Sequence, residues 1–326
     1  RKREMDETNN KYITLIGASN WDMFTYCDRI PAIGETIKGT NFKVSFGGKA
    51  ANQAVQASLL GSKCYIITKL GDDVFGDNTL NNFRTRGVSV DHVTCVNGVS
   101  SGCASITVDK DGHNNIIIVG GSNDLLSEDD VANAAKTIQN SSYLLCQLET
   151  SLATTYRALV TAKGSQKCKS ILNVSPVTSD KEMLRKLLTV VDILVVNEVE
   201  LAMLSNSLES EVNVEKLETV HHASQRLLGI HTNIADIIVT LGAKGVVLTS
   251  RATIDNYKHI VAPIEVLHGL KVVDTTGAGD SFIGSLAHFL TQGHSLSDSI
   301  GKACRVAAIS VTRYGTQTSY PSISEL

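Results

Sequence analysis

Short apolar runs alternate along the chain with longer stretches in which apolar residues recur at helical spacing. Apolar runs bounded by turn-forming residues are typical of buried parallel strands, and a spacing of three to four residues is typical of amphipathic helices. The pattern predicts strands at 12–17, 64–70, 143–148, 170–174, 192–196 and 236–241. It predicts helices at 50–60, 77–86, 128–139, 181–188, 214–228, 280–291 and 296–312. This alternation indicates an α/β protein built on a largely parallel sheet.

Two regions, 23–45 and 101–119, interrupt the alternation and lack helical periodicity. Within the second, residues 104–109 alternate between apolar and polar side chains, which is typical of a strand with one solvated face. Asp111-Gly112 has the composition of a hairpin turn. We therefore expect strands contributed by about 18–46 and 100–120 to pair into a small sheet that forms a lid over one end of the main sheet.

The rest of the chain has the character of one large unit. Of its 326 residues, 42% are hydrophobic and 19% are charged, the balance of a globular protein with a full core. No long linker, internal repeat or low-complexity tract divides the sequence, so we expect residues 11–326 to form a single domain. Residues 1–10 are polar and charged, without the apolar core of a signal peptide, and we expect a disordered leader there.

Charge and cysteine spacing narrow the partners and the setting. The formal net charge of −3 argues against a nucleic acid or an anionic membrane as the main partner, and no apolar stretch is long enough to span a bilayer. The seven cysteines are scattered, odd in number and without C-x-x-C spacing, which favours reduced thiols and a cytoplasmic location. The final Ser324-Glu325-Leu326 is only weakly similar to a peroxisomal signal, since Glu325 stands where that signal has a base.

The most informative segment is the small-residue loop at 274–282, which follows a short apolar run and opens the helix predicted at 280–291. Gly277, Ala278 and Gly279 let backbone N–H groups converge, and a helix N-terminus adds partial positive charge, so the loop predicts an anion-binding hole. Asp280 at its rim is poorly suited to binding phosphate but well suited to taking a proton from a hydroxyl that attacks phosphate. The alternative is that Asp280 only caps the helix.

Two better-known phosphate-binding motifs are excluded. The third glycine position of a dinucleotide fingerprint holds Phe282, which disfavours a dinucleotide-dependent oxidoreductase. No Gly-Lys-Ser or Gly-Lys-Thr occurs in the chain, so a Walker A loop is absent. If the chain binds ATP, it does so by another scheme.

Two further segments carry polar side chains at the expected ends of strands. Gly47-Gly48-Lys49 opens a helix with Asn52 one turn in, where its amide faces the same end as the loop. Asn20 and Asp22 follow the first strand, where open α/β sheets bind ligands. Each segment suits vicinal hydroxyl groups, and each has a plain alternative as a turn with solvated side chains.

Together and in this order, these segments resemble the ribokinase branch of the PfkB sugar-kinase family. The resemblance runs from about Tyr12 to Pro321 and includes both family signatures, Gly47-Gly48-Lys49 with Asn52 and the run from Asp274 to Asp280. It implies a three-layer α/β/α sandwich with a mostly parallel central sheet and a small β-sheet lid. It also implies a homodimer formed through the lid, whose open strand edges favour pairing between chains.

The resemblance implies roles for particular residues. Asp280 corresponds to the family's base, and Gly277, Ala278 and Gly279 to its anion hole. The sugar contacts of the family correspond to Asn20, Asp22, Gly48, Lys49, Ala50, Ala51, Asn52 and Glu149. The nucleotide contacts correspond to Asn197, Thr240, Leu241, Gly242, Ala243, Lys244, Gly245, Gly279, Asp280 and Cys304.

The resemblance also implies ATP, Mg²⁺ and K⁺. Glu200, in the element Asn197-Glu198-Val199-Glu200, corresponds to the residue that acts on Mg²⁺ through water. A monovalent-cation site beside the anion hole corresponds to Asp274, Thr276 (through its carbonyl), Ser310, Arg313, Gly315 and Ser319. Such a cation orders the 274–280 loop without touching the substrate, so it acts through preorganisation.

The implied reaction is transfer of the γ-phosphoryl group of ATP to the 5-hydroxyl of D-ribose. Two departures bear on the sugar: Ala50 stands where the family usually has glycine, and Trp21 is larger than the usual residue. Kinases for fructose, adenosine or 2-keto-3-deoxygluconate are the nearest alternatives, although an aromatic content of 5% disfavours a purine slot. A non-catalytic sugar-binding regulator is a further alternative, but the base and the anion hole are both retained.

Overall fold

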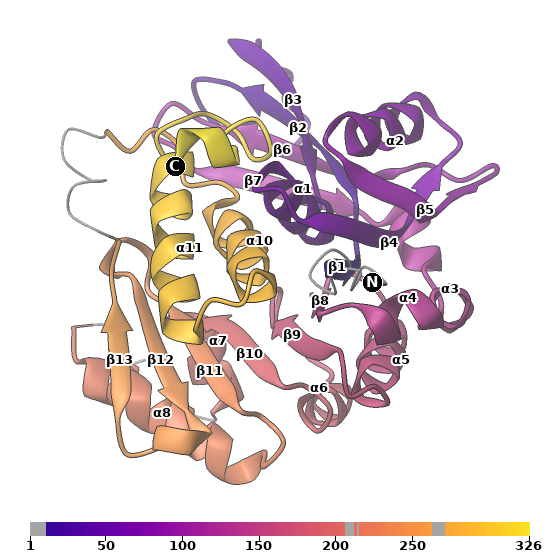
Figure 1. The fold of residues 1–326 in the computed structure, drawn as a ribbon. Helices are drawn as coiled ribbons and strands as arrows, with labels where there is room; N and C mark the ends of the chain where they lie inside the picture. Colours follow the sequence, from indigo (N-terminus) through magenta and orange to yellow (C-terminus); the bar gives the residue numbers. More distant parts are fainter. Residues whose placement is uncertain (1–10, 206–211, 214, 263–270) are drawn as a thin grey trace.

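The computed structural model describes residues 11–205, 212–213, 215–262 and 271–326. Within these residues the central layer is a nine-stranded sheet in the order β13-β12-β11-β10-β9-β8-β1-β4-β5 (Figure 1). Neighbouring strands from β11 to β5 are parallel, whereas β12 is antiparallel to both β11 and β13. The strands are β1 (Tyr12–Ile16), β4 (Lys63–Gly71), β5 (Val88–Val96), β8 (Tyr143–Cys146), β9 (Lys169–Asn173), β10 (Ile193–Asn197), β11 (Asp236–Thr240), β12 (Val246–Ser250) and β13 (Tyr257–Ile260).

Helices cover both faces of this sheet, which confirms the expected three-layer α/β/α fold (Figure 1). One face carries α1 (Lys49–Leu59), α2 (Val74–Thr85), α10 (Ala278–Thr291) and α11 (Leu296–Ser310). The other carries α3 (Glu128–Asn133), α4 (Ala135–Asn140), α5 (Leu152–Lys163), α6 (Lys181–Leu188), α7 (Glu198–Leu204) and α8 (Leu217–Ile230).

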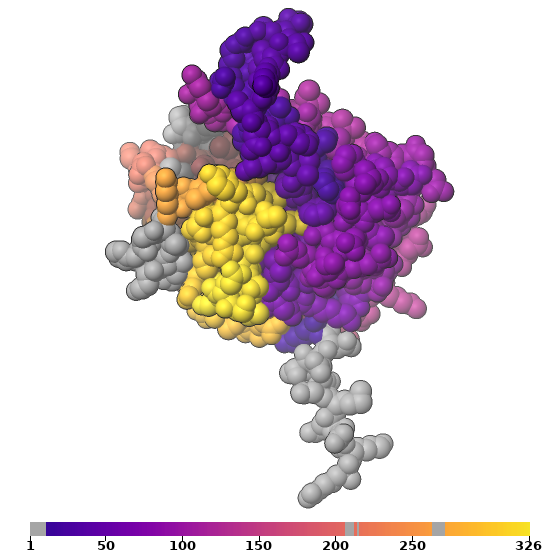
Figure 2. All heavy atoms as spheres, turned by 90° about the horizontal axis from the view of Figure 1, so that it is seen from above, coloured from indigo at the N-terminus to yellow at the C-terminus, as the bar shows by residue number. Residues whose placement is uncertain are grey.

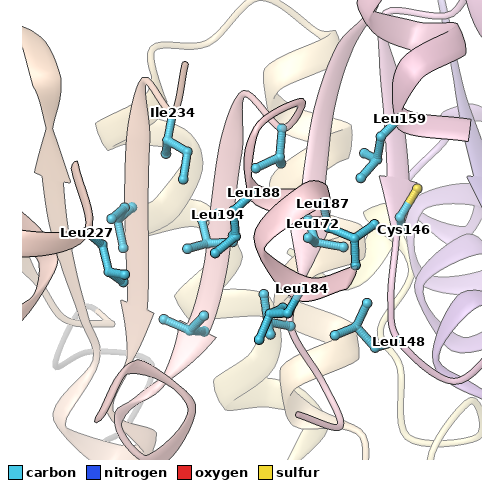
Figure 3. Packing of buried hydrophobic residues seen from close by; sticks show 14 of the residues in the cluster. Cys146, Leu148, Leu159, Leu172, Leu184, Leu187, Leu188, Leu194, Leu227 and Ile234 are labelled. Carbon is cyan, nitrogen blue, oxygen red and sulfur yellow. The ribbon is translucent and has the colours of Figure 1, made fainter. Parts of the chain in front are cut away.

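Successive residues of the strands enter two different cores because side chains alternate across a sheet. In β8, Leu144 packs with the helices from α3 to α8, whereas Leu145 packs with α1, α10 and α11. Figure 3 shows part of the first core, where Leu184 and Leu187 of α6 lie against Leu172 of β9. The continuous apolar runs of the sequence therefore reflect strands that are buried on both faces.

The lid is a separate four-stranded sheet in the order β3-β2-β6-β7, and its outer strands project from the body of the molecule (Figure 2). Strand β2 is parallel to β6, and the other pairs are antiparallel. The Oγ1 of Thr316, in the C-terminal segment, donates to the carbonyl of Phe46 at 2.6 Å and ties the lid to the main domain. The strands are β2 (Asn20–Tyr26), β3 (Asn41–Gly47), β6 (Gly102–Val108) and β7 (Asn114–Val119).

Some predicted elements differ from the observed ones. The single helix expected at 128–139 is broken at Ala134, whose φ of −94° and ψ of 4° end α3 before α4 begins. The helix expected at 214–228 begins at Leu217, and residue 214 lies outside the described residues. Strands β5, β12 and β13 and helices α5 and α7 were not predicted.

The leader expected at 1–10 also lies outside the described residues. Among the helices that the structure describes, none combines the length and the apolar character needed to cross a membrane.

Candidate active site

The loop from Asp274 to Asp280 turns into the N-terminus of α10, as the small residues predict. Gly277 is the N-cap of α10, with a left-handed φ of 75° that favours glycine. A Cβ at this position would lie 2.7 Å from the hydroxyl of Tyr320, which donates to the Gly277 carbonyl at 3.0 Å. The buried Tyr320 therefore fixes the turn that opens the helix.

Asp280 lies in the first turn of α10, and its side chain caps no backbone group of that helix. The alternative that Asp280 is only a helix cap is therefore wrong. Its carboxylate is 8% exposed and accepts two hydrogen bonds from α1, one from Asn52 Nδ2 at 3.0 Å and one from Gln53 Nε2 at 2.9 Å. The two glycine-led helix starts, far apart in the sequence, thus meet at one carboxylate.

A charged cluster stands beside this carboxylate. Burial and the Asp280 carboxylate raise the pKa of Asp22 to about 6, although Lys49 opposes the shift. Burial raises the pKa of Glu149 to about 7, and its Oε2 accepts the backbone N–H of Lys49 at 2.7 Å. Burial opposes the charge on the Lys49 ammonium, but the surrounding carboxylates hold its pKa above the ordinary value. The cluster offers both donors and acceptors to a polyol.

Glycines allow the lid and α1 to approach these side chains closely. A Cβ at Gly47 would lie 2.2 Å from Oδ2 of Asp22, and one at Gly48 would lie 2.5 Å from the carbonyl of Ala18. Gly48 also has a φ of 85° as the N-cap of α1. The glycine pair is thus required where the junction from β3 to α1 passes close to Ala18 and Asp22.

Asn20, 7% exposed at the start of β2, is fixed by a residue that the sequence analysis missed. Nδ2 of the buried Asn123 donates to Oδ1 of Asn20 at 2.7 Å, and Oδ1 of Asn123 accepts the N–H of Ser19 at 2.9 Å. Because one lone pair of its oxygen is engaged, Asn20 offers a ligand its two amide donors and one remaining acceptor site.

Neither departure from the family pattern faces the charged cluster. Ala50 is 0% exposed, and its Cβ would lie 2.9 Å from a Cβ built at Gly17. Ala50 and Ala51 both belong to the core between α1 and the sheet, so their side chains offer no contact to a ligand. Trp21 points toward α2, where its Nε1 donates to the Phe75 carbonyl at 2.9 Å. The expectation that these side chains bear on sugar choice is therefore not supported by their positions.

A cavity of about 390 Å³ with mainly apolar walls lies on the other side of the α10 N-terminus. It shares Thr240 and Gly279 with a polar cavity of about 200 Å³ that reaches Lys49, Asn197 and Asp280. Residues on the wall of the apolar cavity include Thr240, Gly242, Ala243, Gly245, Phe282 and Cys304. Burial raises the pKa of the Cys304 thiol to about 12, so this residue is an apolar contact rather than a thiolate.

Two of the expected nucleotide contacts point elsewhere. Leu241 is 5% exposed and packs in the core, and the Lys244 ammonium forms an ion pair with Glu215. Neither side chain lines the cavity, so only the backbone of this turn is available there. The apolar walls, including Val246 and Ala307, were not predicted because single apolar residues carry no motif.

Glu200 and Asn197 form a capping box at the start of α7. Asn197 Oδ1 accepts the N–H of Glu200, and Glu200 Oε2 accepts the N–H of Asn197, both at 2.8 Å. Glu200 is 7% exposed, lines the polar cavity, and has a pKa raised by burial. A carboxylate at the wall of a polar cavity fits a Mg²⁺ ion that keeps its waters.

The residues expected at the monovalent-cation site lie on the loop before α10, at the last residue of α11 and in the segment that follows α11. Oδ1 of Asp274 accepts the N–H of Thr276 at 2.9 Å, and Oδ2 accepts the N–H of Gly315 at 2.9 Å. The side chains of Ser310 and Ser319 are 1% exposed and donate to local carbonyls, whereas Arg313 points away to Glu325. The oxygen-rich surroundings fit a hard cation. The two hydrogen bonds of Asp274 already hold the two segments together without a cation.

Comparisons with known proteins identify the family of the chain. The sequence profile of the pfkB family of carbohydrate kinases matches residues 10–323. The chain belongs to this family. A ribokinase of Dictyostelium discoideum is 55% identical over 96% of this chain and 98% of its own length. A deoxyribokinase of Salmonella typhi is 37% identical over 96% of each chain. The structure of a pfkB-type relative, Arabidopsis thaliana ribokinase complexed with ribose and ATP, has a TM-score of 0.82 and 28% identity over 96% of each chain.

Proposed function

We propose that this chain is an ATP-dependent kinase that phosphorylates D-ribose on its 5-hydroxyl. The observation that carries the proposal is the position of Asp280. Its carboxylate lines the polar cavity at the N-terminus of α10 together with Lys49, and it couples electrostatically to Asp22 and Glu149. Similarity to ribokinases over nearly the whole chain supports ribose as the acceptor.

In the proposed reaction the ribose 5-hydroxyl attacks the γ-phosphorus of ATP. Asp280 takes the hydroxyl proton as the new O–P bond forms, and the bond from the γ-phosphorus to the β–γ bridging oxygen breaks. ADP leaves with the electron pair of that bond. The backbone N–H groups of Gly277 and Gly279 stabilise the charge that develops on the transferred group. The N–H of Ala278, expected to join them, donates to the Thr275 carbonyl at 3.2 Å and must turn from it to contribute.

The chain's own side chains hold the two substrates in line. Asn20 donates to the sugar, the charged cluster binds its other hydroxyls, and the apolar cavity receives the nucleobase. Positioning of this kind supplies a large share of the rate acceleration in phosphoryl transfer. The lid lies over the sugar end and limits access of water, a competing acceptor.

We also propose Mg²⁺ and K⁺ as activators. Glu200 and Asn197 would hold Mg²⁺ through water, and that ion would neutralise charge on the phosphates. Asp274, the Thr276 carbonyl, Ser310, Gly315 and Ser319 would surround K⁺, and Arg313 would contribute only its main chain because its side chain pairs with Glu325. K⁺ would stabilise the loop pair that Asp274 already joins.

A homodimer through the lid and a cytoplasmic setting complete the proposal. Strand β7 is exposed along its whole length, with Ile116, Ile117 and Ile118 at 53%, 68% and 65%. Consecutive exposed apolar side chains on an edge strand favour burial against a second copy. We expect the wild-type chain to sediment as a dimer and Ile117→Lys to sediment as a monomer, and a wild-type monomer would contradict this.

All seven cysteines are free thiols, which supports a reducing compartment.

The test is ADP release from ATP with ribose, 2-deoxyribose, fructose, adenosine or 2-keto-3-deoxygluconate, each in K⁺ or in Na⁺ alone. We expect the highest kcat/KM with ribose, and a higher kcat in K⁺. The similarity to a deoxyribokinase makes 2-deoxyribose the second candidate. A preference for another acceptor would replace ribose in the proposal, and no turnover with any acceptor would contradict the kinase function.

A further inference from the structure

Five amide side chains lie in the protein interior around the Asp280 carboxylate, and none of them lines the apolar cavity. Four of them are almost completely buried, and Asn82 is 8% exposed. They come from α1, α2, the end of β8 and the C-terminal segment, which are far apart in the sequence. The set comprises Asn52, Gln53, Asn82, Gln147 and Gln317.

These amides form two hydrogen-bonded chains that end on different oxygens of one carboxylate. In the first, Gln147 Nε2 donates to Gln53 Oε1 at 2.7 Å, and Gln53 Nε2 donates to Asp280 Oδ1 at 2.9 Å.

The second chain is one member longer. Asn82 Nδ2 donates to Gln317 Oε1 at 2.8 Å, and Gln317 Nε2 donates to Asn52 Oδ1 at 3.0 Å. Asn52 Nδ2 then donates to Asp280 Oδ2 at 3.0 Å.

The direction of both chains follows from the chemistry of amides and carboxylates. An ionised carboxylate only accepts hydrogen bonds, so each adjacent amide must turn its NH₂ group toward Asp280 and its oxygen away. That oxygen then needs a donor, which Gln147 supplies on one side and Gln317 on the other. The amide groups next to Asp280 are buried and satisfied on both sides, so they have one arrangement, whereas Oε1 of Gln147, at the far end of the first chain, has no partner among the described residues. The amides leave each carboxylate oxygen a lone pair for a substrate proton.

We propose that Gln53 and Gln317 are positioning residues for the phosphoryl transfer, Gln53 acting through Asp280 and Gln317 acting through Asn52. The proposal rests on the kinase function proposed above. Gln53 belongs to the core around the base and is 0% exposed, so it reaches no substrate and acts through the carboxylate alone. Gln317 orients Asn52, an expected sugar contact, and so bears on sugar binding as well as on the base.

The test compares Gln53→Met with Gln56→Met in the full chain. Methionine keeps the length of glutamine and removes the amide. Gln56 is the matched control because it is also 0% exposed on α1, donates to the Pro321 carbonyl at 3.0 Å and accepts from Ser281, but does not contact Asp280. Steady-state kinetics with ribose and ATP and thermal unfolding are measured for both.

We expect Gln53→Met to lower kcat roughly 10- to 100-fold, because a misplaced base loses its alignment with the attacking hydroxyl. Its KM values should stay within about twofold, since no ground-state contact is lost. Gln56→Met should lose comparable thermal stability and keep the wild-type kcat. Equal kcat values in the two variants, or a change in KM alone for Gln53→Met, would overturn the positioning role of Gln53.

Gln317→Met gives an independent readout if Gln53→Met does not fold. We expect a lower kcat together with a higher KM for ribose, while the KM for ATP stays unchanged. Wild-type kinetics in Gln317→Met would overturn the proposal. An inactive wild-type chain would instead overturn the kinase function and the positioning role with it, whereas an active wild-type chain with unchanged variants would overturn the positioning role alone.

Discussion

Replacing Gly277 by alanine tests whether the turn before α10 serves catalysis as well as folding. The added Cβ would sit in a left-handed conformation, at a φ of 75°. It would also lie 2.7 Å from Tyr320 Oη and 3.1 Å from Thr316 Cγ2. Either Tyr320 and Thr316 or the backbone at residue 277 must shift to relieve these contacts. A shift of the backbone would also move the N–H groups that are proposed to bind the phosphate.

The magnitude follows from these two effects. A non-glycine residue in the left-handed region costs about 1–2 kcal/mol. Overpacking against a buried side chain such as Tyr320 adds about 1–3 kcal/mol. With an unfolding entropy near 2.1 cal/mol/K per residue, each kcal/mol lowers the Tm of a chain this long by about 1–2 °C. Loss of one anion-hole donor lowers kcat by about 10²–10³-fold.

Gly293→Ala is the matched control, because Gly293 follows the other end of α10 with a φ of 89° and has no neighbouring atom in reach of a Cβ. Differential scanning calorimetry and steady-state kinetics are measured on both variants. We expect Gly293→Ala to lose only the backbone part of the stability, at wild-type kcat, and Gly277→Ala to lose more stability and most of its kcat. A stable Gly277→Ala with wild-type kcat would refute the reasoning.

Three further outcomes are expected. Asp280→Asn should lower kcat by about 10²–10⁴-fold while calorimetric ribose binding persists, and normal turnover would contradict its role as base. Burial raises the pKa of Glu149 from 4.5 to about 7, so the folded chain holds a proton that the unfolded chain has lost. The free energy of unfolding should therefore fall by about 3 kcal/mol as pH rises through this window, and Glu149→Gln should remove this contribution in denaturant titrations. Trp21→Phe loses the bonds to Phe75 and Thr79 and should cost about 1 kcal/mol in the same titrations, and a changed ribose KM would contradict its placement.

The fold was predictable wherever one pattern dominated. The strands buried on both faces and the helices α1, α6, α10 and α11 follow from apolar periodicity and lie within a few residues of their expected bounds. Strand β12 was missed because residues 240–245 were interpreted only as a nucleotide loop. The N–H of Leu241 donates to the Gly245 carbonyl at 2.8 Å, so the same residues form the hairpin between β11 and β12.

Helix α7 was also missed because one motif has two roles. The pattern from Asn197 to Glu200 was interpreted as a phosphate-site element, yet it is also the signature of a capping box that starts a helix. One short motif here fixes a helix start and places a carboxylate on the cavity wall. Local sequence supports both interpretations, and only the position of α7 beside the cavity joins them.

The residues of the candidate site that belong to motifs could be predicted from the sequence, but the residues that hold them in place could not. Asp280, Lys49 and Asn52 carry recognisable motifs, whereas Gln53, Asn123 and Gln317 act through contacts between distant segments. The bond from Gln317 to Asn52 joins residues 265 positions apart. No local periodicity or spacing encodes such a contact.

The central claim is transfer of phosphate to the 5-hydroxyl of ribose, and the identity of the product tests it most directly. The product of ribose and ATP would be isolated, and the phosphate assigned to a carbon by ³¹P–¹H correlation NMR. The account predicts a single phosphomonoester on C5 that forms at least about 10²-fold more slowly with Asp280→Asn than with the wild-type chain. A phosphate on C1, or equal rates of product formation by the two chains, would contradict it.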